Sequence, residues 1–282
     1  FEQQSRYQKI VITQWKDNYW LYINGNQQLS SVDEVMYHEP LVHPAMTLAP
    51  QPQRVLILGG GDGCAVREVL KYPSVTDITL VDLDPAMTTL GKENPVLLSL
   101  NDSSLYNPKV NIYHQDGYTY LEKADTYYDV IIVDLPDPKT VDLNRLYTLE
   151  FYRMAYHHLR NHGVLITQAG SPYFATRAFQ CIDLTVAEAG FQTAMLHNQI
   201  VTMGEWGWIM GVKTTADAQV KEQLKSLSFD AVPTKWINRE AMQLMTSFGK
   251  NIYVTPTDSV EVNQVHNPVL YQYYLKGNWD WY

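Results

Sequence analysis

The middle of the chain alternates short apolar runs with segments whose apolar residues recur at helical spacing. The apolar runs predict strands at residues 54–58, 77–81, 110–114, 129–133, 164–167, 193–198 and 206–212. Helices are predicted at 64–71, from 85 onward, at 149–159 and at 175–189. This alternation is typical of an α/β fold, in which a doubly wound, mostly parallel sheet carries helices on both faces.

The first part of the chain has a different, β-rich pattern. It predicts strands at 9–15 and 19–24, and Asn24-Gly25 is a strong signal for a hairpin. Ser31 and Glu34 have the spacing of a capping box, in which the serine accepts from a backbone amide of the first turn and the glutamate bonds back to the Ser31 amide. A helix that contains Tyr37 and His38 should follow.

Beyond residue 214 the pattern changes again. Short helices are predicted at 218–227 and 239–248, before an aromatic tail at 271–274 and 279–282. We expect this tail to dock on the main domain, because chain ends stay ordered only when they are tied down. The chain therefore divides into a small N-terminal β-domain with a linking helix (1–50), an α/β domain (51–214) and a C-terminal helical extension (215–282).

Composition and charge narrow the possible functions. Among 282 residues, 21 Lys and Arg face 30 Asp and Glu, a formal net charge of −9. This balance argues against a nucleic-acid partner, which needs clustered cations, and suits a small cationic ligand. Cys64 and Cys181 are too few for a disulfide framework or a zinc cluster, and the histidines lack metal-binding spacing, so no metal site is expected. No apolar stretch approaches the ~18–20 residues of a spanning helix.

A glycine-rich turn, Gly59-Gly60-Gly61-Asp62-Gly63, follows the first strand of the α/β domain and opens a helix. Glycines let the backbone approach a ligand closely, and a helix start presents free amides. Asp82 lies 20 residues beyond Asp62, at the end of the second strand, where an acid accepts from ribose hydroxyls. These features predict a nucleoside site at the carboxyl ends of the strands.

Asp62 narrows the predicted ligand. A carboxylate in the turn would repel a pyrophosphate or a carboxylate tail and attract an ammonium group. Cys64 also replaces the last small residue of a dinucleotide fingerprint. The alternative is that Asp62 only caps the helix. Asp116-Gly117 follows the third strand, where the acid either accepts the adenine amine or simply forms a turn.

The fourth strand runs into a second acidic motif, Asp134-Leu135-Pro136-Asp137-Pro138. Two carboxylates at a strand end can hold a diamine and take a proton from it, and the prolines stiffen the segment. Residues 134–148 show little helical or strand pattern, which is typical of a binding loop or lid. Asp134 is the expected proton acceptor, with Tyr37 and His38 at the same site. The alternative is that both acids are solvated loop residues.

These motifs together resemble the polyamine aminopropyltransferases of the spermidine synthase family. The matching stretches, in order, are residues 24–28, 33–39, 59–63, 81–84, 115–117 and 134–138. The variants at 134–138, 143–147 and 204–207 look most like the bacterial subgroup whose catalytic domain follows an N-terminal membrane domain. That would explain a chain that starts at Phe1.

The resemblance implies a fold, a reaction and a set of site residues. The fold is a Rossmann-like, methyltransferase-type sheet beside a small β-domain. The reaction is aminopropyl transfer from decarboxylated S-adenosylmethionine, a co-substrate rather than a cofactor, to putrescine, releasing methylthioadenosine. The implied roles are catalysis by Asp134 and Tyr37, donor binding by Gln28, Gly59, Gly61, Asp62, Asp82, Asp116 and Gly117, and acceptor binding by His38 and Asp137.

The resemblance also implies a homodimer or homotetramer, and a cytoplasmic catalytic domain anchored through the membrane domain. Two departures touch the acceptor side: Val201 stands where the family carries a tyrosine, and Lys139-Thr140 replaces Gly-Pro. Putrescine is therefore a default acceptor, with agmatine, cadaverine and longer polyamines as alternatives. Two other functions are considered: a methyltransferase that uses intact S-adenosylmethionine, and a nucleoside- or polyamine-binding module without activity.

Overall fold

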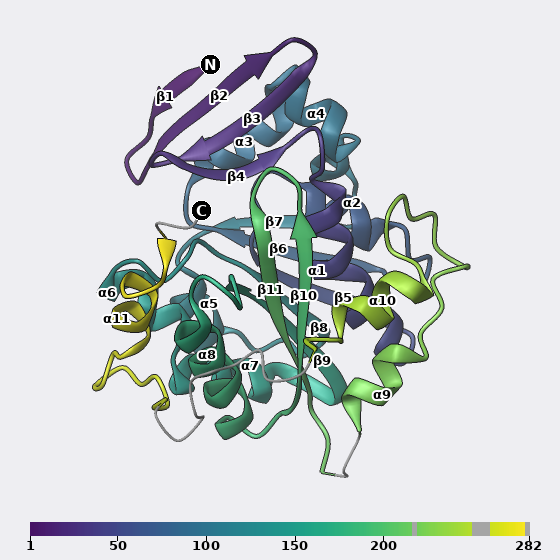
Figure 1. Ribbon diagram of the computed structural model, residues 1–282. Helices are drawn as coiled ribbons and strands as arrows, with labels where there is room; N and C mark the ends of the chain where they lie inside the picture. Colours follow the sequence, from purple (N-terminus) through teal and green to yellow (C-terminus); the bar gives the residue numbers. More distant parts are fainter. Residues whose placement is uncertain (216–218, 250–259, 280–282) are drawn as a thin grey trace.

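A computed structural model of the chain describes residues 1–215, 219–249 and 260–279. The chain forms two sheets (Figure 1). The first is antiparallel, in the order β1-β2-β3-β4, with strands β1 (Glu2–Gln4), β2 (Lys9–Trp15), β3 (Asn18–Ile23) and β4 (Asn26–Ser30). Asn24 and Gly25 join β3 to β4 with φ values of 50° and 81°, so the predicted hairpin is confirmed.

The helix expected after this sheet is α1 (Val35–Leu48), but its predicted capping box is wrong. The Ser31 hydroxyl accepts from the Tyr19 amide, and the Ser31 amide donates to the Tyr19 carbonyl, so Ser31 extends the small sheet. The Glu34 carboxylate points to Arg67 and His38. The Glu34 carboxylate therefore bonds to Arg67 and His38 instead of bonding back to the Ser31 amide, as the local pattern had predicted.

The second sheet has seven strands in the order β10-β11-β9-β8-β5-β6-β7. Strands β5, β6, β7, β8 and β9 pair in parallel with one another, and β11 pairs antiparallel with both β9 and β10. The strands are β5 (Arg54–Gly59), β6 (Asp77–Asp82), β7 (Val110–His114), β8 (Tyr128–Asp134), β9 (Leu159–Gly170), β10 (Gln192–Ile200) and β11 (Gly204–Val212). Every strand predicted for the α/β domain is present, so the expected doubly wound α/β class is confirmed.

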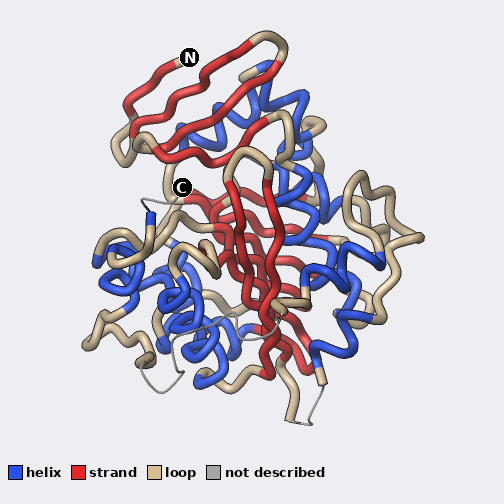
Figure 2. The backbone as a smooth tube through the Cα atoms, viewed as in Figure 1, coloured by secondary structure: helices blue, strands red, loops and turns tan. Residues whose placement is uncertain are grey.

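Helices cover both faces of this sheet (Figure 2). On β5, Val55 and Ile57 pack with α1 and α2, whereas Leu56 and Leu58 pack with α7 and α8 on the other face. Alternate residues of β5 point to opposite faces of the sheet, and both faces are buried. The strand is therefore apolar at every position from Val55 to Leu58. The helices between strands are α2 (Cys64–Leu70), α3 (Pro85–Glu93), α4 (Pro95–Asn101), α5 (Gly117–Lys123), α7 (Leu149–His158) and α8 (Thr176–Glu188), with a short 3-10 turn η1 (Ser104–Tyr106).

The loop after β8 is more ordered than its sequence indicates. It contains the short helix α6 (Val141–Asn144) and the 3-10 turn η2 (Arg145–Tyr147). The Thr140 hydroxyl caps α6 by accepting from the Leu143 amide. The Tyr147 hydroxyl donates to the carbonyls of Leu135 and Pro136, which fixes the acidic motif at the strand end.

The C-terminal helices pack on the helices and strands of the α/β domain. Helices α9 (Val220–Lys225) and α10 (Arg239–Met245) lie on one side of the sheet, and α11 (Leu270–Leu275) lies on the other, beside α8 and α6 (Figure 1). The Glu39 carboxylate accepts from the backbone amides of residues 235–237, which fastens the segment before α10 to α1. Residues 280–282 of the predicted aromatic tail lie outside the described residues. No helix in the described part of the chain has the length and apolar character to cross a bilayer.

Candidate active site

The acidic residues gather where the central strands end. Strands β6, β5 and β8 are neighbours, and Gly59 at the end of β5 pairs in register with Asp134 at the end of β8. Gly59 has φ +83°, and a Cβ there would lie 2.0 Å from the Asp134 carbonyl oxygen. Only glycine allows this approach, so the glycine turn lies directly against the second acidic motif.

Asp82 holds the other side of the same turn. Its Oδ2 accepts from the Gly61 amide at 3.0 Å, and its Oδ1 accepts from the Asp84 amide at 2.8 Å. A Cβ on Gly61 would lie 2.5 Å from Oδ2, so this contact also requires glycine. Burial raises the pKa of Asp82 to about 6, although the two amide bonds oppose the effect.

Asp62 lies at the start of α2, between the turn and α1. Its Oδ1 accepts from the Cys64 amide at 2.8 Å, so the helix-start alternative describes a real contact. The same oxygen lies 3.9 Å from His38 Nε2. One carboxylate oxygen of Asp62, one ring nitrogen of His38 and one carboxylate oxygen of Asp134 all lie within 4.8 Å of one another. The structure therefore brings together residues that the sequence predicted for the donor side, the acceptor side and catalysis.

Tyr37 and Asp134 form a direct pair. The Tyr37 hydroxyl donates to Asp134 Oδ1 at 2.7 Å, and the Tyr37 ring packs against Trp208 with centroids 5.5 Å apart. Burial raises the pKa of Asp134 to about 6; the charge of His38 opposes this rise, and that of Asp62 adds to it. A carboxylate with this pKa is ionised at neutral pH and is a stronger base than an exposed aspartate.

A buried ionic network behind the site was not predicted from the sequence. His38 Nδ1 lies 2.9 Å from Glu34 Oε2, and two guanidinium nitrogens of Arg67 each lie 2.9 Å from the same carboxylate. Burial alone would lower the pKa of His38, but its bond to Glu34 and the charge of Asp62 outweigh it and raise the pKa to about 9. His38 is therefore an imidazolium at neutral pH, placed beside Asp62 and Asp134.

Asp137 lies at the other end of the acidic motif. Its Oδ2 accepts from the Tyr274 hydroxyl at 2.6 Å, and its Oδ1 lies 3.5 Å from Gln168 Nε2. Burial raises the pKa of Asp137, and the hydrogen bond from Tyr274 and the charge of Lys139 oppose this rise. Tyr274 comes from α11 in the C-terminal extension, 137 residues along the chain from Asp137, and no local signal in the sequence could have indicated the pair.

Asp116 and Gly117 lie at the end of β7, at the start of α5. Asp116 Oδ1 accepts from the Thr119 amide at 2.9 Å, and Oδ2 pairs with Arg145 at 2.6 Å. Burial would raise the pKa of Asp116, but the Thr119 amide and Arg145 lower it below its usual value. A Cβ on Gly117 would be at ordinary contact distance from Leu58, so packing does not require glycine there. The bond from the Thr119 amide shows that Asp116 does form the turn before α5, and its role in adenine binding stays a prediction.

Among the residues that the structure describes, no hydrogen bond joins the Gln28 side chain to the acidic residues. Its amide nitrogen donates to the carbonyls of Asn26 and Gln27 in its own strand. Val201, which stands where the family carries a tyrosine, lies on the turn between β10 and β11 and is 69 % exposed. The predicted role of Gln28 in nucleoside binding therefore has no support from its contacts and stays a prediction.

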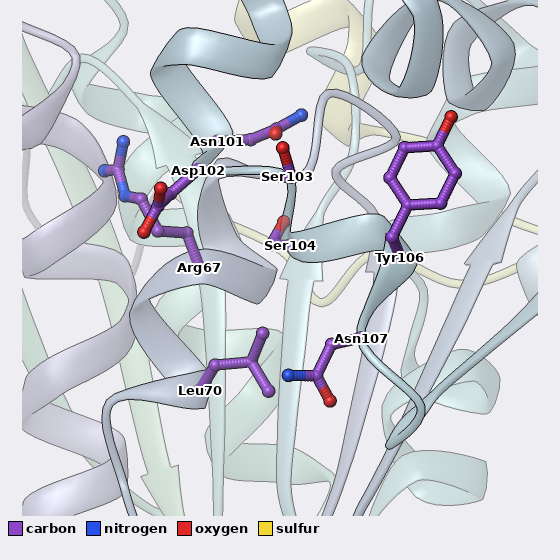
Figure 3. A pocket seen from close by; sticks show the side chains of 8 residues that line it. All are labelled: Arg67, Leu70, Asn101, Asp102, Ser103, Ser104, Tyr106 and Asn107. Atoms are coloured by element: carbon purple, nitrogen blue, oxygen red, sulfur yellow. The ribbon is translucent and has the colours of Figure 1, made fainter.

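A cavity of about 400 Å³ lies behind the glycine turn, between α2 and η1 (Figure 3). Two of its lining residues hold the turn in place. Asn101 Nδ2 donates to the Asp62 carbonyl, and the Ser104 hydroxyl donates to the Gly63 carbonyl, both at 2.7 Å. The cavity thus lies beside the supports of the glycine turn, and Asp62, Asp82 and Asp134 are not among its lining residues.

Replacing Ser104 with alanine is expected to lower the free energy of unfolding by about 1–2 kcal/mol, because the buried Gly63 carbonyl loses its hydroxyl donor. Urea denaturation would measure the change. Ser226→Ala is the matched control, since the Ser226 hydroxyl bonds to the Gln223 carbonyl on the exposed surface. Equal stability of the two variants would show that the Ser104 bond does not support the turn.

The raised pKa of Asp134 predicts an acid limb in the pH profile. A base must be ionised. Under the aminopropyl transfer that the sequence resemblance implies, kcat/KM for the amine, measured at saturating donor, should therefore fall about tenfold per pH unit on the acid side of the Asp134 pKa. The midpoint is expected at or below about 6, because a bound cationic donor favours the ionised carboxylate. Methylthioadenosine release between pH 4.5 and 8 would measure this. A rate independent of pH over that range would remove Asp134 as the base.

A parallel sheet with a glycine turn and acids at neighbouring strand ends defines the class of Rossmann-like α/β proteins. A family model described as the spermine/spermidine synthase domain matches residues 34–223. The chain belongs to this family. The resemblance of the sequence motifs to the spermidine synthase family is thereby confirmed.

Relatives and solved structures agree with this assignment. The chain is 41 % identical to polyamine aminopropyltransferase 2 of Ralstonia nicotianae over 278 residues, 99 % of this chain and 52 % of the relative. It is 42 % identical to the polyamine aminopropyltransferase of Oceanobacillus iheyensis over 281 residues, 99 % of this chain and 53 % of the relative. The chain thus spans about half the length of the curated relatives it matches.

Two solved structures are similar across most of the chain, each at 28 % identity and 88 % coverage of this chain. One is a spermidine synthase in complex with the transition state analogue AdoDATO, with a TM-score of 0.79 and 85 % of that chain covered. The other is a spermidine synthase from Thermotoga maritima, with a TM-score of 0.77 and 84 % of that chain covered. The small sheet, the seven-stranded sheet and the helices therefore form the fold of this family.

Proposed function

We propose that the chain transfers an aminopropyl group from decarboxylated S-adenosylmethionine to a diamine, with putrescine as the default acceptor. The observation that carries this proposal is the convergence of Asp62, His38 and Asp134 within 4.8 Å, with the Tyr37 hydroxyl on Asp134. The relatives' name, polyamine aminopropyltransferase, supports aminopropyl transfer, and a similar spermidine synthase solved with the transition state analogue AdoDATO supports the same reaction. A donor with a sulfonium and an ammonium group fits a site rich in carboxylates.

On the donor side, Asp82 would accept from the ribose hydroxyls and Asp62 would hold the ammonium of the aminopropyl group. Gly59 and Gly61 allow the turn to approach the nucleoside, since a side chain at either position would collide with a strand end. We assign the adenine environment to Gln28, Asp116 and Gly117. The bond from Arg145 occupies one oxygen of Asp116, so an adenine amine would meet the remaining lone pairs of that carboxylate.

On the acceptor side, the amine nitrogen attacks the methylene carbon next to the sulfonium. A carbon–nitrogen bond forms, the carbon–sulfur bond breaks, and its electron pair stays on sulfur, which leaves as neutral methylthioadenosine. The amine must first lose a proton, which Asp134 accepts, and Tyr37 holds the carboxylate in place. The neighbouring His38 imidazolium and the sulfonium both lower the pKa of the acceptor amine, which favours this transfer. We assign His38 and Asp137 to the acceptor-binding side of the site.

One experiment tests the reaction. The protein is incubated with decarboxylated or with intact S-adenosylmethionine and a panel of diamines, and the products are identified by mass. Methylthioadenosine together with an aminopropylated amine is the expected result. Adenosylhomocysteine would indicate the methyltransferase, and tight methylthioadenosine binding without turnover would indicate a non-catalytic module.

We also propose, from the resemblance, that the chain assembles as a homodimer or homotetramer. We propose in addition that it acts as the cytoplasmic catalytic domain of a protein with an N-terminal membrane domain. Light scattering of the purified chain would measure the mass of the assembly. A monomer at micromolar concentration would contradict the first of these proposals.

A further inference from the structure

Three distant parts of the chain meet around the Asp137 carboxylate. Tyr274 from α11 donates its hydroxyl to Oδ2 at 2.6 Å. Lys139, two residues along the loop, places its ammonium 3.6 Å from the same oxygen and donates to Asn26 Oδ1 in the N-terminal hairpin at 2.6 Å. Gln168 at the end of β9 faces the other oxygen at 3.5 Å. The second acid of the motif is thus enclosed by residues that the chemistry described above does not use.

The Tyr274 side chain is held firmly. It is 3 % exposed, and its ring lies against the Trp279 ring with centroids 4.7 Å apart. Trp279 Nε1 donates to the Tyr274 carbonyl at 2.8 Å, which ties the end of the described chain to α11. Gly170 leaves room for the ring, since a Cβ there would already contact it at 3.4 Å. The hydroxyl therefore reaches Asp137 from a fixed position.

Lys139 places a positive charge at the same point. Its ammonium lies 5.7 Å from the centroid of the Tyr274 ring as well as 3.6 Å from Asp137. The side chain is 35 % exposed, so solvent weakens but does not remove its field. An incoming cation that binds Asp137 must share the carboxylate with this ammonium.

We propose that Lys139 and Tyr274 determine which acceptor binds at Asp137, and that they select a diamine whose far end carries one ammonium group. This inference rests on the proposed aminopropyl transfer and names the acceptor class for it. A guanidinium binds a carboxylate best as a two-pronged fork, and Tyr274 and Gln168 already face the two oxygens. A triamine carries a further charge toward Lys139, which repels it.

The test compares acceptors on two variants of the purified protein. The kcat/KM values are measured for putrescine, agmatine and spermidine, with methylthioadenosine release as the readout. Lys139→Met should raise the ratio for spermidine over putrescine about tenfold at low ionic strength, and added salt should reduce the difference. Tyr274→Phe should raise the ratio for agmatine over putrescine about fivefold, because it frees a lone pair of Asp137. The KM for the donor should not change in either variant.

Matched controls are Lys276→Met and Tyr271→Phe. Both residues belong to the same C-terminal segment, Lys276 is exposed, and neither faces Asp137 among the contacts of the described residues. Unchanged acceptor ratios in both test variants, with aminopropyl transfer intact, would overturn this inference alone. A wild-type protein that transfers no aminopropyl group to any of the three amines would instead remove the proposed function, and with it this inference.

Discussion

Replacing Asp134 with asparagine is expected to lower kcat for aminopropyl transfer about a thousandfold, within the ~10²–10⁴-fold typical of general bases. The amide keeps an oxygen for the Tyr37 hydroxyl, so the side chain stays in place but cannot take a proton. Methylthioadenosine release under saturating substrates would measure kcat. Donor binding, followed by calorimetry, should change little, because Asp82 and Asp62 provide most of its contacts in the proposed site.

The same strand supplies a control for this prediction. Asp129 lies at the opposite end of β8, where Oδ2 accepts from the amides of Gln53 and Arg54. Asp129→Asn changes the same chemical group on the same strand and should retain nearly full activity. A kcat loss in Asp134→Asn no greater than in Asp129→Asn would show that Asp134 is not the proton acceptor.

Replacing Asp62 with asparagine is expected to weaken binding of decarboxylated S-adenosylmethionine about 10- to 100-fold. This is the value of one charge-assisted contact, ~1.5–3 kcal/mol. The asparagine oxygen can still accept from the Cys64 amide, so α2 should start as before. The expected loss comes from the ammonium of the donor, which no longer faces a carboxylate. Calorimetric titration with the donor, and separately with methylthioadenosine, would measure it.

Methylthioadenosine lacks the ammonium, so its affinity should be nearly unaffected by Asp62→Asn. Asp102→Asn is a suitable control, because Asp102 is exposed behind the turn and has φ 53°, a conformation that asparagine also adopts. Equal losses for the donor and for methylthioadenosine would contradict the ammonium assignment. Unchanged donor affinity would do the same and would favour the methyltransferase alternative.

The strands and helices of the α/β domain could be predicted because their signals are local. The apolar run at β5 and the glycine turn that follows it specify a strand, a turn and a helix start with few alternatives. The acids Asp62, Asp82 and Asp134 could be predicted to meet, since parallel strands end at one edge of a sheet. The predicted capping box at Ser31 is wrong because it depends on a short local pattern. Glu34 forms a buried ion pair with Arg67 instead, and this long-range interaction is stronger than a helix cap.

The sequence by itself determined the sheet, the glycine turn and the acids at the strand ends, because these depend on hydrophobic periodicity and on residues adjacent in the chain. Only the tertiary structure decided what surrounds the acids. Glu34 pairs with Arg67 across 33 residues and raises the pKa of His38, and Tyr274 reaches Asp137 across 137 residues. Such pairs have no sequence spacing of their own, because the packing of separate elements brings them together, and that packing fixes the charge state of the site.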